Sequence, residues 1–117
     1  MMKRLSGLAA TGVILLSGCA TTGEPSSVSG LGARNNPVKA DMPPGQRDYL
    51  SRLRCSDGKA PAFERQGSVG MANDGHVVDG YAVTCAGATS VVIHMDMYHQ
   101  GYQETRAVQG FTLSSGE

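Results

Sequence analysis

Tryptophan is absent from this chain of 117 residues, which has only two phenylalanines and four tyrosines. Large aromatic side chains supply much of the buried area of a small domain, so their scarcity predicts a modest hydrophobic core. A small domain with such a core commonly relies on a covalent crosslink. Cysteines are the residues that could form such a crosslink.

An excess of either charge is also missing, because ten basic side chains balance ten acidic ones. A nucleic-acid-binding protein needs a basic surface to meet the phosphate backbone. We therefore do not expect a nucleic-acid partner.

The chain also lacks an apolar run of the length that spans a bilayer, about 20 residues. Its uncharged, mostly apolar stretch 5–16 is shorter and follows the positive Lys3 and Arg4. The small residues Ser17 and Gly18 then precede Cys19. A basic start, a short apolar segment and small residues before a cut are the parts of a signal peptide.

The order Leu16-Ser17-Gly18-Cys19 resembles the signal of bacterial lipoproteins. The resemblance implies that residues 1–18 are removed and that the Cys19 thiol carries lipid. Several acyl chains make such an anchor effectively permanent, whereas one gives only reversible binding. Because Ala20 stands where an aspartate favours the inner membrane in enterobacterial lipoproteins, the resemblance implies the periplasmic face of the outer membrane.

Two cysteines remain once Cys19 is assigned to lipid. Export would place Cys55 and Cys85 in an oxidising compartment, where disulfides persist. A bond between them would close a thirty-residue loop and stabilise the fold by about 3.5 kcal/mol. Buried free thiols, a redox pair or a metal pair are the alternatives, although the sequence has no C-x-x-C motif. We predict a structural disulfide.

The chain divides by composition into a signal peptide, a tether and one domain. Residues 19–42 are rich in glycine, proline, serine and asparagine, which is typical of a linker. Few apolar side chains there offset the entropy cost of ordering. We therefore expect a flexible tether over 19–42 and a folded domain over 43–117.

The expected domain is α+β, with one N-terminal helix on a small antiparallel meander of three to four strands. Leu50 and Leu53 share one side of an amphipathic helix over 46–54. Strand patterns follow at 62–71, 76–86 and 90–98, and a fourth strand is expected within 104–113. Asn73-Asp74-Gly75 indicates a hairpin turn between the first two. The expected core joins the two leucines to Tyr81, Val83, Ile93 and Met95.

The histidines and acids are too few in any one stretch to indicate a site. His94 and Asp96 point the same way on their strand, with His99 nearby, but zinc usually needs three or four ligands. His76 would join them only if strand pairing carried it there. We expect no metal site and no cofactor, and the polar outer face of a sheet explains these residues.

Catalytic chemistry is not expected either. A nucleophile needs an adjacent base held by a third group, and the stretch around Ser68 only partly resembles a Gly-x-Ser-x-Gly elbow. The densest polar and aromatic stretch, which contains Tyr98, His99 and Tyr102, lies where the third strand should end. It is either a recognition surface or a rim that covers the core edge.

The expected function is therefore that of an accessory or protein-interaction module on a lipid anchor at the outer membrane. The expected partners are another envelope protein or peptidoglycan. Alternatives are a peptidoglycan-binding module, an inhibitor of a cell-wall hydrolase and, least favoured, a small enzyme.

Overall fold

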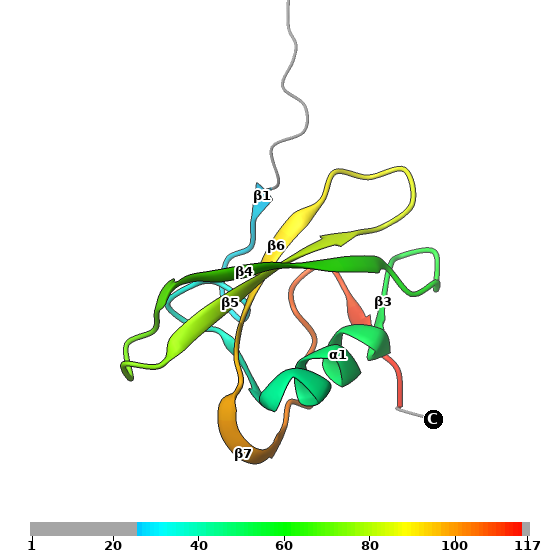
Figure 1. Ribbon diagram of the computed structural model, residues 1–117. Helices are drawn as coiled ribbons and strands as arrows, with labels where there is room; N and C mark the ends of the chain where they lie inside the picture. The colour runs from blue at the N-terminus through cyan, green and yellow to red at the C-terminus, as the bar shows by residue number, and fades with distance from the viewer. Residues whose placement is uncertain (1–25, 116–117) are drawn as a thin grey trace, which may run out of the picture.

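The computed structural model of the protein describes residues 26–115, which form eight strands and one helix (Figure 1). The one helix in this part of the chain is not long and apolar enough to cross a membrane. In chain order the elements are β1 (Ser26–Ser27), β2 (Val38–Asp41), α1 (Met42–Arg52), β3 (Leu53–Arg54), β4 (Ala62–Met71), β5 (Val77–Thr84), β6 (Val91–Asp96), β7 (Tyr98–Gln103) and β8 (Thr112–Leu113).

A mixed, six-stranded sheet dominates the fold, in the order β4-β5-β6-β2-β7, with β1 also paired to β6. The β4–β5–β6 part is antiparallel, whereas β1 and β2 both run parallel to β6. Strands β3 and β8 form a separate two-stranded sheet. Helix α1 lies against one side of the main sheet (Figure 1).

The expected α+β fold, with a helix on an antiparallel meander of three to four strands, was wrong, because the fold is mostly β. The error begins in residues 26–41, which were assigned to the tether but contain the sheet strands β1 and β2. Val38 is fully buried, and Val28 and Leu31 pack against the core. These apolar side chains stand singly among glycines and asparagines, so their contribution depends on tertiary contacts that no local pattern displays.

The end of the chain also differs from expectation. The stretch 98–103 is the strand β7, whereas only Thr112–Leu113 of the expected fourth strand has strand structure. Tyr49 on α1 holds the intervening loop: its hydroxyl donates to Arg106 O at 2.8 Å and accepts from Val108 N–H at 3.1 Å.

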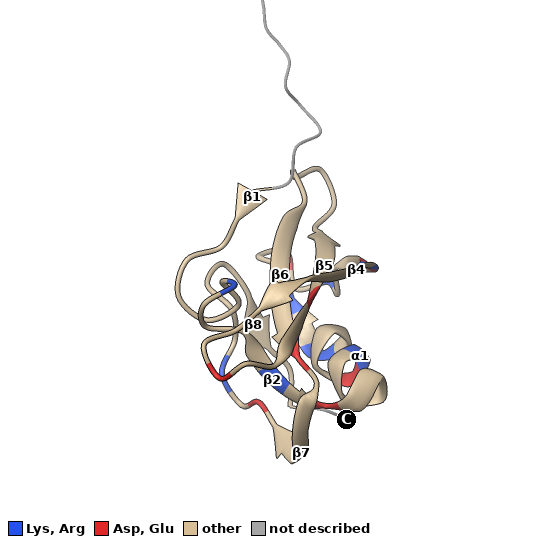
Figure 2. Cartoon of the chain, turned by 60° about the vertical axis from the view of Figure 1, so that its left-hand side comes forward, with Lys and Arg blue, Asp and Glu red and all other residues tan. Residues whose placement is uncertain are grey.

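Several local expectations are confirmed. Helix α1 occupies most of the expected range but starts earlier, and it has prolines in its first turn, where a missing N–H costs little. Charges of both signs alternate on it (Figure 2). Strands β4, β5 and β6 lie in the expected places, and the turn at 73–75 joins the first two. Cys55 and Cys85 form the predicted disulfide.

The core has the expected composition. Leu50 and Leu53 bury their side chains fully and belong to one cluster with the inward side chains of β5 and β6. That cluster contains Tyr81, Val83, Ile93 and Met95, together with Val38, Tyr49 and Val108.

Tyr49 makes the fold sensitive to alkali. Burial raises the pKa of Tyr49 to about 12, despite the Val108 N–H that hydrogen-bonds its oxygen, from an ordinary value of 10.0. Below pH 10 the phenol is neutral in the folded and in the unfolded protein, so Tyr49 makes its full contribution to the free energy of unfolding. As the pH rises from 10 towards 12, the unfolded chain loses this proton first, so we expect stability to fall by about 1.4 kcal/mol per pH unit.

Urea denaturation at pH 9, 10 and 11 would measure this loss. Tyr49→Phe should flatten the decline, while Tyr98→Phe, which changes an exposed tyrosine, should leave it as steep as in the wild type. An equal slope in Tyr49→Phe would contradict the assignment.

Candidate functional site

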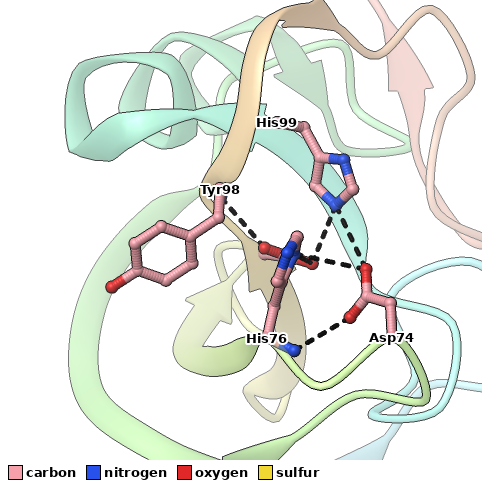
Figure 3. A network of polar contacts seen from close by, with 5 residues as sticks. Asp74, His76, Tyr98 and His99 are labelled. Carbon is pink, nitrogen blue, oxygen red and sulfur yellow. Dashed lines mark hydrogen bonds and ion pairs between the residues drawn. The ribbon is translucent and has the colours of Figure 1, made fainter.

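Four polar side chains that are far apart in the sequence meet at one end of the main sheet. We call Asp74, His76, Asp96 and His99 the His–Asp cluster. Asp74 lies in the β4–β5 turn and His76 directly before β5, while Asp96 ends β6 and His99 is the second residue of β7. In Figure 3 the His99 ring and the Asp74 carboxylate come from opposite sides and point towards each other.

The four functional atoms alternate between nitrogen and oxygen. Asp96 Oδ2 lies 2.9 Å from His76 Nδ1 and 2.8 Å from His99 Nε2. Asp74 Oδ2 contacts the same two nitrogens, at 3.2 and 3.5 Å. Each carboxylate oxygen therefore bridges both imidazoles, and all four atoms lie within 4.8 Å of one another.

Backbone N–H groups orient both carboxylates. Tyr98 N donates to Asp96 Oδ1 at 3.0 Å, and His76 N donates to Asp74 Oδ1 at 3.0 Å. In each carboxylate the second oxygen is left to face the histidines. Such outer hydrogen bonds fix the direction of metal-binding side chains in proteins.

Burial differs sharply within the cluster. The Asp96 side chain is only 1% exposed, whereas Asp74 is 41% exposed and His76 is 37% exposed. Burial by itself would raise the pKa of the Asp96 carboxyl, but hydrogen bonds from Tyr98 N–H and both imidazoles outweigh it and lower that pKa. The cluster thus has an ionised, buried oxygen at its base and an open side at the β4–β5 turn.

Aromatic rings flank the two histidines. The Tyr98 ring lies edge-on to His76, with centroids 5.8 Å apart, and the Tyr102 ring lies edge-on to His99 at 6.3 Å. Tyr98 and Tyr102 remain 47% and 41% exposed. The proposed recognition stretch therefore borders the His–Asp cluster.

The structure separates His94 from the residues with which the sequence grouped it. His94 Nδ1 lies 3.1 Å from Gly32 O, in the segment that precedes β2, and is not in the cluster. His76 belongs to the cluster instead of His94, because the β4–β5 hairpin folds back along β6. The antiparallel register pairs Asp79 with Met95, and three further steps bring position 76 opposite position 98.

Sequence reasoning did not select Asp74 as a ligand candidate. It recognised the turn at 73–75 from its backbone preference and did not assign a role to the aspartate side chain. An aspartate two residues before a histidine, in a turn that leads into a strand, is the available signal. That signal becomes informative only when the strand register is known.

Another buried carboxylate belongs to a separate network. Asp79, at 1% exposure, accepts hydrogen bonds from Gln46 and Arg65, both at 3.0 Å. Tyr81 in turn donates to the Gln46 side-chain oxygen at 2.8 Å. This network braces α1 against the sheet.

Chemically, the His–Asp cluster offers two imidazole nitrogens and two carboxylate oxygens at the spacing of a metal coordination shell. The lipidation candidate Cys19 lies outside the described residues. No protein-family model, no curated protein and no solved structure matches the chain.

Proposed function

We propose that this protein binds a divalent transition-metal ion of the zinc class at the His–Asp cluster. The observation that carries the proposal is the convergence of four ligand-type atoms, alternately nitrogen and oxygen, within 4.8 Å of one another.

The spacing is near that of a four-coordinate zinc ion. Bonds of about 2.1 Å from zinc to nitrogen or oxygen give ligand atoms about 3.4 Å apart along the six edges of a tetrahedron. Four of the six pairs in the cluster, the nitrogen–oxygen pairs, are 2.8 to 3.5 Å apart, and the other two pairs lie within 4.8 Å. A metal ion would replace the protons that the imidazoles now direct at the carboxylates, with only small shifts of the side chains.

The ligand chemistry favours zinc and its neighbours over hard cations. Imidazole suits zinc, copper, nickel and iron, whereas calcium takes six to eight oxygen ligands and magnesium retains several waters. The cluster has no thiolate, unlike many structural zinc sites. Together with the exposure of Asp74, this supports a site from which the ion exchanges with its surroundings.

We expect the full-length protein, purified in detergent, to bind one zinc ion in competition with a chromogenic chelator. Replacing either histidine of the cluster, as His76→Gln or His99→Gln, should weaken binding by more than about a hundredfold. Loss of an outer-shell partner lowers metal affinity by up to about a hundredfold. Because the two histidines would be direct ligands, their loss should cost more.

The matched control is His94→Gln, because His94 has the same side chain but hydrogen-bonds Gly32 O outside the cluster. Binding in this variant should equal that of the wild type. Equal loss in all three variants, or stoichiometric binding that survives in His99→Gln, would count against the cluster.

The cellular setting that we propose is a lipid-anchored accessory module at the periplasmic face of the outer membrane. The lipoprotein-like sequence at Cys19 supports the anchor. The exposed Tyr98 and Tyr102 support a contact surface for another envelope protein or for peptidoglycan. Crosslinking in living cells, with fractionation of the membranes, would test both; recovery in the inner membrane would overturn the sorting proposal.

A further inference from the structure

We propose that the metal-loaded His–Asp cluster takes up a small oxyanion, such as phosphate or a carboxylate, in the pocket beside it. This inference rests on the metal binding proposed above and adds the ligand class and the residue that selects it.

The pocket has a volume of about 160 Å³ and is in contact with both carboxylate residues of the cluster. Its polar wall combines one cation with three amides. These residues are Lys39, Asn35, Asn36 and Asn73. Ammonium and amide N–H groups are hydrogen-bond donors, and an oxyanion needs donors of this kind.

The sheet brings Lys39 to this place. Strand β2 runs parallel to β6, and the register pairs Lys39 with Asp96. Lys39 is half-buried, lines this pocket and forms no ion pair within residues 26–115. Its ammonium group is therefore available to a ligand.

The charge of the pocket reverses when metal binds. With neutral histidines, Asp74, Asp96 and Lys39 sum to −1, so an anion is repelled. A divalent ion changes the sum to +1, and an anion is then attracted to both the metal and Lys39. We therefore expect oxyanion binding to depend on metal, because opposite charges at close range interact strongly where water is partly excluded.

The pocket has room for a small oxyanion. Its volume of about 160 Å³ is several times the space of one water molecule, about 30 Å³, so phosphate or acetate fits. The anion would add to the four protein ligands as a fifth, a coordination number that zinc adopts in some sites.

The test uses the full-length protein loaded with cobalt(II), whose visible spectrum reports on the coordination shell. Inorganic phosphate and, separately, acetate are titrated in an otherwise weakly coordinating buffer. We expect a saturable spectral change with the wild type. Lys39→Met should weaken anion binding by about tenfold or more while it retains cobalt. Lys59→Met, which changes an exposed lysine in the loop between β3 and β4, should behave like the wild type.

A second measurement keeps the result independent of how one variant folds. Phosphate must tighten cobalt binding to the wild type by the same factor by which cobalt tightens phosphate binding. Cobalt binding with no response to either anion, or undiminished anion binding in Lys39→Met, would overturn this inference and leave the metal site standing. Failure of the wild type to bind cobalt or zinc would overturn both proposals.

Discussion

Replacing both Cys55 and Cys85 by serine lowers the free energy of unfolding by about 3.5 kcal/mol, because the unfolded chain gains the freedom of a thirty-residue loop. In a domain of this size such a loss lowers the melting temperature by about 15 °C or more. The bond joins the segment after α1 and β3 to the end of β5, so its removal also releases the helix from the sheet. Thermal unfolding followed by circular dichroism measures the shift.

Reduction supplies the control for the disulfide. A reductant should lower the melting temperature of the wild type to that of the double variant, and it should leave the double variant unchanged. A double variant that melts within a few degrees of the oxidised wild type would show that the sheet is stable without the crosslink.

The second large effect concerns the buried network around Asp79. Asp79→Ala removes the oxygen that accepts the Gln46 amide at 3.0 Å, and Gln46 is fully buried. A buried donor without an acceptor costs about 1–3 kcal/mol, and removal of one member of a buried charged pair costs more. The Arg65 side chain is 48% exposed and can turn to water when Asp79 is lost. We therefore expect Asp79→Ala to lower the free energy of unfolding by about 3 kcal/mol, which is less than the loss of a partner from a fully buried charged pair would cost.

Asp79→Asn is the matched variant for this network. It keeps an oxygen for the Gln46 amide and removes only the charge, so we expect less than half of the loss caused by alanine. Urea denaturation of the two variants beside the wild type gives the comparison. Equal losses in both would assign the stabilisation to the charge of Asp79 and not to its hydrogen bond with Gln46.

The elements that the sequence predicted correctly carry their own local signals. Helix α1 has an apolar side with proline at its start, and β5 and β6 are rich in β-branched and aromatic residues at the spacing of a strand. The turn at 73–75 has the residues that a tight hairpin prefers. The disulfide followed from the count of cysteines in a chain that we expect to be exported.

The elements that the sequence did not predict depend on contacts between distant segments. Parallel pairing of β1 and β2 with β6 has no sequence signal in residues 26–41, where glycine, asparagine and proline indicate a linker. The His–Asp cluster was hidden for the same reason. Its members span two strand connections, and a shift of one residue in the β5–β6 register would turn the hairpin's side chains to the other face.

The direction of β6 gives the domain two distinct poles. Ser26 pairs with Val91 at the start of β6, and Asp96 closes the strand five residues later, about 16 Å away at the usual rise per residue. A lipid on Cys19 would lie at most about 25 Å of extended chain from Ser26. In the proposed lipid-anchored form, the His–Asp cluster would therefore lie at the end of β6 that is farther from the anchor.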